Sequence, residues 1–313
     1  MNKKIVYVTG CTGFIGSHVT RACLEQGWFV YGIDKMTYAS NEIFLEEFYT
    51  YEKFRFEQVD LCDIKRLYDC DYVINTAAET HVDNSIESSD AFVHSNINGV
   101  HNLLKLIASK RQRKPILLHF STDEVYGDIA EGSHTETDLL RPSNPYSATK
   151  AAADQLIIAW GRTHKVPWII VRPTNNYGIG QYVEKLIPKT VKFLAVGRKI
   201  DLHNGGTPVR TWLHASDTAQ AIMTIIGVGV KNEIFNISGN YETENLIVVK
   251  KILTEMLGHD QVEGFTEELV REGQDVRYSI DDSKLKALGW EPKANFDEEL
   301  KKIIKYYTEN FIW

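Results

Sequence analysis

Several features that mark other protein classes are missing or rare in this sequence. The 313 residues include only four cysteines, and their spacing is neither that of a zinc site nor that of a disulfide-rich scaffold: Cys11, Cys23, Cys62 and Cys70. Few cysteines without a disulfide pattern are typical of a reducing compartment. We therefore expect a cytoplasmic protein without a metal site.

Long apolar runs and an excess of positive charge are also absent. The apolar run near the start covers only residues 5–8, which is too short for the core of a signal peptide. No run approaches the roughly 18 apolar residues that cross a bilayer. The formal net charge is −7, whereas proteins that bind nucleic acid usually carry a basic face. We expect neither a membrane nor a nucleic acid as partner.

What the chain does have is an alternation of strand and helix patterns. The apolar strands KIVYV and WFVYGID flank the helical pattern GSHVTRACLEQG, and the strands DYVINTAA and PILLHFS flank NGVHNLLKLIAS. Strands joined through helices of this length predict right-handed crossovers and a parallel sheet. The fold class expected is α/β, with a Rossmann-like doubly wound sheet and a smaller C-terminal lobe.

The later part of the chain is less regular. Residues 144–161 predict a long helix with Asn144 as N-cap, Pro145 at the first position and Gly161 at the end, and residues 166–173 predict another strand. From Thr174 the alternation weakens. We expect a first domain over 1–172, to which the chain returns at about 210–238 through RTWLH and EIFNIS, and a second lobe formed by 173–209 and 239–313.

Three glycines after the first strand have the spacing G-x-x-G-x-x-G: Gly10, Gly13 and Gly16. Such a trio alone could mark a plain turn, but here it joins a strand to a helix, and Asp34 ends the next strand. In that setting a pyrophosphate can approach the backbone at the helix N-terminus, and Asp34 can bind a ribose diol. The acid favours NAD over NADP, although Lys35 weakens this preference. Asp60 is either an ordinary loop acid or a partner for the adenine amine.

Two adjacent acids stand in STDEVYGD, residues 121–128, directly after an apolar strand. Like charges at such a place cost energy unless they are solvated, paired or used in chemistry. Ser121 and Glu124 also fit a helix capping box, which needs no chemistry. A capping box should open an apolar helix, whereas this segment runs into glycines, so a loop is favoured.

Tyr146 and Lys150 are spaced i, i+4 and share one face of the predicted helix. An ammonium beside a phenol favours phenolate, so the tyrosine could act as a base below its usual pKa of about 10. The same spacing occurs twice more, at Tyr31 and Lys35 and at Tyr49 and Lys53. Tyr146 differs because it opens a helix just after the strand that ends in STDE.

Together the motifs resemble those of the nucleoside-diphosphate-glucose 4,6-dehydratases, which are extended short-chain dehydrogenase/reductases. The resemblance rests on TGCTGFIGS, DKMTYASN, AAETHVDNSI, FSTDEVYGD, PSNPYSATKAAADQL, NNYGIGQYVEKLIP, PVRTWLH and LKALGWEP. The glycine motif and Y-x-x-x-K are shared with epimerases, decarboxylases and many reductases. The Thr-Asp-Glu triplet is the motif that distinguishes dehydratases.

The resemblance implies an NAD-dependent hydro-lyase that converts an NDP-glucose, dTDP-glucose before UDP-glucose, into an NDP-4-keto-6-deoxy sugar and water. Tyr146 would deprotonate the C4 hydroxyl, tuned by Lys150 and hydrogen-bonded to Thr122. Glu124 would remove the C5 proton, and Asp123 would protonate the departing C6 hydroxyl. An ordinary aspartic acid is ionised at pH 7, but burial and a neighbouring carboxylate can raise its pKa.

The same resemblance implies further binding residues. Cofactor contacts are expected from Gly10, Gly13, Phe14, Ile15, Gly16, Asp34, Lys35, Asp60, Leu61, Ala77, Ala78, Asn96, Tyr146 and Lys150. Nucleotide-sugar contacts are expected from His81, Asn175, Lys185, Arg210, Asn245 and Arg271. The charged members could instead be solvated surface residues, and His81 a structural one. A homodimer paired through the Tyr146 helix and its neighbour is also expected.

The sequence departs from the usual family pattern where the nucleotide should bind. The departures are Val183, Asp201, His203, Asn204, Gly273 and Gln274. The nucleobase therefore stays open. Two other functions also remain: a sugar-nucleotide 4-epimerase or decarboxylase of the same fold, and a non-catalytic NAD-binding scaffold protein.

Overall fold

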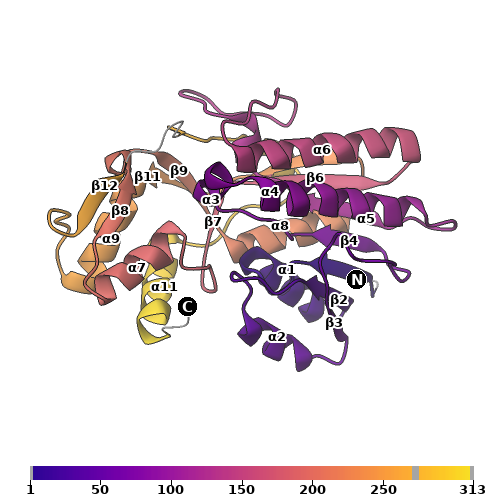
Figure 1. Cartoon of the computed structure of the whole chain (residues 1–313), viewed down its shortest axis with the longest axis horizontal. Coiled ribbons are helices and arrows are strands. Elements are labelled where there is room, and N and C mark those ends of the chain that lie inside the picture. The colour runs from indigo at the N-terminus through magenta and orange to yellow at the C-terminus, as the bar shows by residue number, and fades with distance from the viewer. Residues whose placement is uncertain (1–2, 270–274, 311–313) are drawn as a thin grey trace.

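A seven-stranded parallel sheet forms the centre of the molecule (Figure 1). The structure, a computed structural model, describes residues 3–269 and 275–310. The strand order is β10-β6-β5-β4-β1-β2-β3. Successive strands are added on one side of β1 up to β3 and on its other side from β4 onwards, so the order reverses between β1 and β4. The strands are β1 (Ile5–Thr9), β2 (Phe29–Asp34), β3 (Phe54–Gln58), β4 (Tyr72–Asn75), β5 (Ile116–Phe120), β6 (Trp168–Pro173) and β10 (Glu233–Ile237). This is the predicted Rossmann-like doubly wound sheet, and the fold class is confirmed.

Helices cover both faces of this sheet because its strands alternate apolar side chains between two cores. Val6 and Val8 of β1 pack with α1 (Phe14–Glu25) and α8 (Ala215–Val228), and Tyr7 packs with α5 (Gly99–Ala108) and α6 (Pro145–His164) on the other face. Shorter helical segments complete this part: α2 (Glu42–Tyr49), α3 (Val82–Glu87), α4 (Asp90–Phe92) and the π-helix η1 (Val93–Asn98).

Helix α6 begins as predicted and ends later than predicted. Asn144 is its N-cap, in a capping box with Ser147, and Pro145 is the first residue. Gly161 does not end the helix, which continues to His164 and is capped by Lys165 in the left-handed region. Gly161 instead leaves room for a ring, because a Cβ there would lie 2.3 Å from Nε1 of Trp168. This close approach is tertiary, so the local pattern misplaced the helix end.

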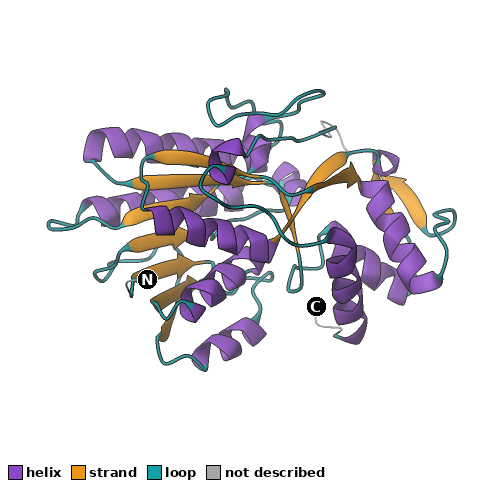
Figure 2. Ribbon diagram, turned by 180° about the vertical axis from the view of Figure 1, so that it is seen from behind, coloured by secondary structure: helices purple, strands orange, loops and turns teal. Residues whose placement is uncertain are grey.

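A second part of the chain forms two small sheets and a helical layer beside the main sheet (Figure 2). Its strands are β7 (Asn175–Tyr177), β8 (Ile200–His203), β9 (Val209–His214), β11 (Tyr241–Glu244) and β12 (Thr266–Leu269). Its helices are α7 (Leu186–Ala195), α9 (Asn245–Leu257) and α11 (Phe296–Glu309), which share an apolar core with Tyr177 and Trp212. The remaining short segments are η2 (Asp123–Tyr126), η3 (Asn204–Gly206) and α10 (Ser283–Lys286).

The returning segment 210–238 divides between the two parts. Strand β10 joins the main sheet beside β6, and α8 covers that sheet. The prediction that RTWLH also returns to it is wrong, because β9 pairs with β7 and β11 and buries Trp212 against Phe296. The division into two domains stays a prediction. Within 3–269 and 275–310, no helix is both long and apolar enough to span a membrane.

Candidate active site

The glycine turn after β1 packs tightly against its neighbours. Gly10 has φ +71° and donates its N–H to the carbonyl of Ile33 at 2.7 Å. A Cβ on Gly16 would lie 1.9 Å from the carbonyl oxygen of Gly10, and a Cβ on Gly10 would lie 2.8 Å from Cα of Ala77. Only glycine therefore lets α1 start this close to the strand ends, which leaves the backbone of the turn facing a cavity.

That cavity lies at the carboxyl ends of β1, β2 and β4, where the strand order reverses. Its lining consists of Gly10, Gly13, Ile33, Asp34, Lys35, Thr37, Ala39, Ser40, Val59, Asp60, Leu61, Thr76, Ala77, Ala78, Glu79 and Ser95. In open α/β sheets ligands bind at such a reversal. The structure thus brings together eight of the predicted cofactor residues: Gly10, Gly13, Asp34, Lys35, Asp60, Leu61, Ala77 and Ala78.

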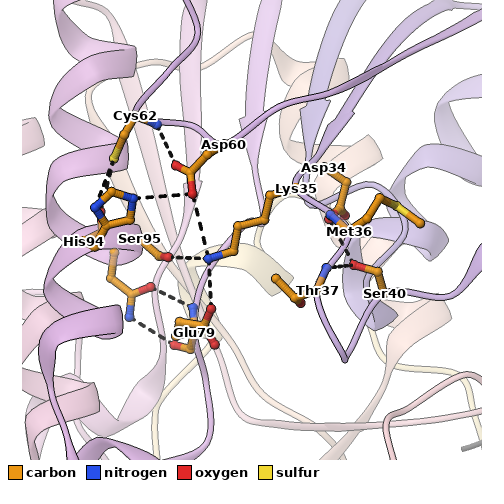
Figure 3. Close-up of polar contacts among 11 residues, drawn as sticks. Asp34, Lys35, Met36, Thr37, Ser40, Asp60, Cys62, Glu79, His94 and Ser95 are labelled. Atoms are coloured by element: carbon orange, nitrogen blue, oxygen red, sulfur yellow. Dashed lines mark hydrogen bonds and ion pairs between the residues drawn. The ribbon is translucent and has the colours of Figure 1, made fainter.

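Asp34 is held in the cavity wall by four hydrogen bonds. Figure 3 shows its partners Met36 and Ser40. Its Oδ2 accepts from the N–H and the hydroxyl of Thr12, at 3.2 and 2.7 Å. Its Oδ1 accepts from the N–H of Met36 at 2.9 Å and the hydroxyl of Ser40 at 3.0 Å. The two hydroxyls can rotate away, which would free acceptor sites for a ribose diol without moving the backbone.

Other residues predicted to touch the cofactor lie outside this lining. They are Phe14, Ile15, Gly16, Asn96, Tyr146 and Lys150. Asn96 is fully buried, accepts the N–H of Glu79, and donates to the carbonyl of Glu79 and the hydroxyl of Thr149. Its amide is therefore used to hold the loop after β4. The structure places Asn96 behind the cavity rather than in its wall.

The STDE segment leads from β5 into one 3₁₀ turn, η2, which begins at Asp123. Thr122 is its N-cap, because its hydroxyl accepts the N–H of Glu124 at 3.3 Å and donates to Oδ1 of Asp123 at 3.1 Å. The hydroxyl of Ser121 instead donates to Asp154 at 3.0 Å. The capping box between Ser121 and Glu124 is therefore absent, and the cap is shifted by one residue.

The two adjacent carboxyl groups have different surroundings. Asp123 is buried, and its Oδ2 has no hydrogen-bond partner among the described residues. Burial and the charge of Glu124 raise its pKa to about 7. Burial also raises the pKa of Glu124, but the charge of Arg210 and a hydrogen bond from Asn144 at 3.3 Å oppose this rise. Asp123 is therefore the group that holds a proton near neutral pH, the direction that the sequence predicts.

Tyr146 opens α6 next to these carboxyl groups. It is buried, and burial raises the pKa of its phenol well above the usual value. The charges of Glu124 and Asp123 add to this rise, while a hydrogen bond with Thr122 opposes it. The structure thus brings Tyr146 together with Thr122, Asp123 and Glu124, as the sequence predicts.

Lys150 lies one turn further along α6 and is also buried. Its ammonium donates to the carbonyl of Phe120 at 2.5 Å. Burial lowers the pKa of Lys150 to about 8, and the charge of Asp154 opposes this. The predicted lowering of the Tyr146 pKa by Lys150 is not seen in this structure, because the ammonium is turned towards the end of β5.

A second cleft lies between the main sheet and the second part of the chain. Its lining consists of Thr80, His81, Val82, Asp83, Glu124, Asn175, Asn176, Gln181, Glu184, Lys185, Leu186, Lys189, Asp201, Leu202, His203, Gly206, Arg210, Trp212, Asn245 and Asp275. It therefore contains Glu124 and five of the predicted substrate residues: His81, Asn175, Lys185, Arg210 and Asn245. The sixth, Arg271, lies outside the described residues, as do Gly273 and Gln274.

Each basic residue of this cleft is anchored. His81 caps α3, because its Nδ1 accepts the N–H of Asn84 at 3.4 Å, so it has a structural role while also lining the cleft. Lys185 donates to the carbonyl of Thr80 at 3.1 Å. The buried Arg210 stacks on the ring of Tyr278, 4.8 Å from its centroid. Stacking of this kind orients the planar guanidinium.

Several lining residues were not predicted from the sequence, among them Lys189, which forms an ion pair with Asp201. Lys189 and Asp201 are 2.6 Å apart and link α7 to β8. Lys189 stands i, i+4 from Lys185, so helical spacing could have placed both ammonium groups on one face. Nothing in the local pattern could have paired Lys189 with Asp201.

The sequence matches the family model described as GDP-mannose 4,6 dehydratase over residues 7–303. The chain belongs to this dehydratase family. The match covers both the glycine turn and the cleft, and it confirms the resemblance found in the motifs.

Known proteins are similar in sequence to this chain over nearly its whole length. The dTDP-glucose 4,6-dehydratase of Haemophilus influenzae is 39% identical, with 97% of this chain and 98% of that protein covered. The low-salt glycan biosynthesis protein Agl12 of Haloferax volcanii is 40% identical, with coverage of 96% and 98%. A crystal structure of dTDP-glucose 4,6-dehydratase from Streptomyces venezuelae, with NAD bound, superimposes with a TM-score of 0.92 at 35% identity, covering 98% and 97%.

Proposed function

We propose that this chain is an NAD-dependent sugar-nucleotide 4,6-dehydratase. It converts an NDP-glucose into the NDP-4-keto-6-deoxy sugar and water, and so serves deoxysugar biosynthesis. The observation that carries this proposal is the buried Asp123 next to the half-buried Glu124, both beside Tyr146, with the pKa of Asp123 raised to about 7. The relatives are named for dTDP-glucose, which supports it as the substrate. UDP-glucose is our second candidate.

The residues of the first cavity fit NAD. The glycine turn would hold the pyrophosphate, because a Cβ at Gly10 or Gly16 would meet backbone atoms there. Asp34 would bind the ribose diol, and Asp60 the adenine amine. NAD bound there would take a hydride from sugar C4 and return it to C6. No basic side chain in the described lining other than Lys35 could hold a 2′-phosphate, and Lys35 is paired with Glu79 at 3.0 Å.

The reaction begins with removal of a proton from the C4 hydroxyl. Tyr146 is suited to this by its place beside Thr122, and its phenol needs nearby positive charge because burial raises its pKa. Lys150 provides that charge below its pKa of about 8. A small turn of its ammonium away from the carbonyl of Phe120 would direct the charge to the phenol.

Elimination of water uses one carboxyl group as a base and the other as an acid. The C4 ketone makes the C5 proton acidic, and Glu124 removes it as a base; burial raises the pKa of Glu124, while Arg210 and Asn144 favour its charged form. The C6 hydroxyl leaves as water only if a proton is supplied. Asp123 supplies it, because it still holds a proton near pH 7.

The cleft would bind the rest of the nucleotide sugar. Lys185 and Arg210 suit the diphosphate as a point charge and a planar fork, while Asn175 and Asn245 offer amide groups to polar atoms of the substrate. His81 lines the same cleft as Glu124, and we assign it to the sugar.

Two other functions are less well supported. An epimerase or decarboxylase of the same fold needs a C4 base but no acid for a C6 hydroxyl, so the raised pKa of Asp123 would have no use. A non-catalytic scaffold would need none of the set Thr122, Asp123, Glu124, Tyr146 and Lys150. Their convergence at one site therefore favours the dehydratase.

Incubation with dTDP-glucose and UDP-glucose, followed by mass spectrometry, tests the proposed function. The dehydratase lowers the product mass by one water. An unchanged mass with inverted configuration at C4 would identify an epimerase, and loss of carbon dioxide from the corresponding uronic acid would identify a decarboxylase. Unchanged substrate with NAD bound would indicate a scaffold.

We also propose a homodimer in the cytoplasm. Apolar side chains of α5 and α6 that are only partly buried by their own chain support pairing through these helices, among them Leu106, Leu156 and Trp160. The free cysteines agree with a reducing compartment. A monomer in sedimentation at micromolar concentration would contradict the dimer.

A further inference from the structure

Three side chains of metal-binding type converge beside the cofactor cavity. Asp60, Cys62 and His94 can each offer one atom, and these atoms all lie within 4.8 Å of one another. Nε2 of His94 is 3.4 Å from Oδ2 of Asp60, whereas the other ring nitrogen, Nδ1, is 3.9 Å from the sulfur of Cys62. A single ion would be bound by only one of these two nitrogens. Figure 3 shows the imidazole between the carboxylate and the thiol.

Local structure holds the three groups in place from two separate segments. Asp60 and Cys62 belong to the turn after β3, where the N–H of Cys62 donates to Oδ1 of Asp60 at 2.9 Å. His94 lies in the π-helix η1, whose wider turn is rare in proteins and is often found at functional sites. The thiol also donates to the carbonyl of His94 at 3.5 Å, which ties the two segments together.

We propose that Asp60, Cys62 and His94 form a binding site for Zn²⁺. A thiolate, an imidazole and a carboxylate are the ligands that zinc uses, whereas magnesium and calcium prefer sets made of oxygen alone. Three protein ligands leave the fourth tetrahedral position for water. Water can reach it, because the side chain of His94 is 52% exposed.

Lys35 limits how tightly this site can bind. Its ammonium lies 4.0 Å from Oδ2 of Asp60, so it opposes a second cation there. The same ammonium has stronger partners in Glu79 at 3.0 Å and the hydroxyl of Ser95 at 2.9 Å, and it can stay with them when zinc takes the carboxylate. A reversible site is therefore expected, rather than one on which folding depends. Zinc also displaces the thiol proton of Cys62 when it binds.

The proposed zinc site shares Asp60 with the cofactor cavity, so bound zinc should affect the binding of NAD. Asp60 lines the cofactor cavity, while Cys62 and His94 do not. A zinc ion that holds the carboxylate of Asp60 removes it from the adenine amine. Zinc and NAD therefore compete for one residue. This competition rests on the proposed function, whereas zinc binding by the three side chains does not.

Direct metal titration tests the site on the full chain without added cofactor. Zn²⁺ is titrated calorimetrically into metal-stripped protein, and Co²⁺ serves as an optical probe, since a thiolate ligand gives a charge-transfer band in the near ultraviolet. We expect one ion per chain and this band. Cys62→Ser and His94→Gln should each weaken zinc binding by about 100-fold or more, because loss of a group that only supports a metal ligand already costs about 10- to 100-fold. Cys70→Ser and His101→Gln are matched controls outside the cluster and should bind zinc normally.

Several results would overturn the zinc site. Among them are a titration that shows no binding, a cobalt complex without the charge-transfer band, and equal losses in the ligand and control variants. Competition is measured separately as the NAD dissociation constant with and without zinc. This dissociation constant should rise with zinc in the parent and stay constant in Cys62→Ser. Without zinc, the affinity of Cys62→Ser for NAD should equal that of the parent. Zinc binding that leaves NAD affinity unchanged would overturn the competition, and failure to bind NAD at all would instead refute the proposed function.

Discussion

Replacing Asp123 with asparagine would separate the two halves of the proposed reaction. The amide has nearly the same shape as the carboxyl group but no acidic proton, so C4 oxidation should continue while loss of the C6 hydroxyl stops. A positioned general acid contributes about 100- to 10,000-fold to a rate. We expect turnover to fall by that factor, with reduced cofactor accumulating on the enzyme.

The same substitution should change how stability depends on pH. The pKa of Asp123 is about 7 in the folded protein and 3.8 for an ordinary aspartic acid. Between these values the folded protein keeps a proton that the unfolded chain has lost, so stability is full below pH 3.8 and falls as the pH rises towards 7. Three pKa units at about 1.4 kcal/mol each give a loss on the order of 4 kcal/mol. Asparagine does not titrate and avoids this loss.

Two measurements check this prediction. Denaturant unfolding is measured from pH 4 to pH 8. As the pH rises, the free energy of unfolding should fall in the parent relative to that of Asp123→Asn. Single-turnover absorbance should show the reduced cofactor. Asp128→Asn is the matched control for turnover, because Asp128 lies in the same segment, is exposed, and accepts the N–H of Val276, which an amide oxygen can also accept. Normal turnover in Asp123→Asn, or a stability difference independent of pH, would refute the reasoning.

Three other substitutions give further predictions. Glu124→Gln should still oxidise C4 but stall before elimination, so reduced cofactor should accumulate in a spectrophotometric assay; normal turnover would exclude Glu124 as the C5 base. Tyr146→Phe should lose about 100- to 10,000-fold in the rate of the first oxidation while binding NAD normally by calorimetry, and unimpaired oxidation would remove Tyr146 from the mechanism. Gly16→Ala should destabilise the fold by about 3 kcal/mol or more in denaturant unfolding and weaken NAD binding, because its Cβ would lie 1.9 Å from a carbonyl oxygen. Gly227→Ala, in a helix with open space around it, is the control and should be neutral or slightly stabilising; equal losses in both would contradict the packing argument.

The parts of the fold that could be predicted are those specified locally. The glycine turn, the alternating strands and helices, and the cap at Asn144 each depend on a few adjacent residues, and the structure has them. The end of α6 could not be predicted from Gly161, because a glycine is needed there to leave room for the ring of Trp168 and not to end the helix. Strand β9 was misplaced for a similar reason, since its pairing partners are distant in sequence.

The candidate site shows the same limit. The residues that meet at η2 and α6 were predicted because they stand in short motifs. Asn96 was expected to contact the cofactor, and this stays a prediction. Its amide bonds to Glu79 and Thr149, a tertiary arrangement that no motif reveals. Likewise, the turn of Lys150 towards Phe120 depends on the end of another strand.

The fate of the hydrogen at sugar C4 tests the proposed function most directly. Substrate carrying deuterium at C4, dTDP-glucose first and UDP-glucose second, would be converted completely and the product examined by NMR and mass spectrometry. If the proposed reaction is correct, the product will be one water lighter than the substrate and will carry the deuterium on C6. A product that has kept its water and carries the deuterium at C4 would contradict it.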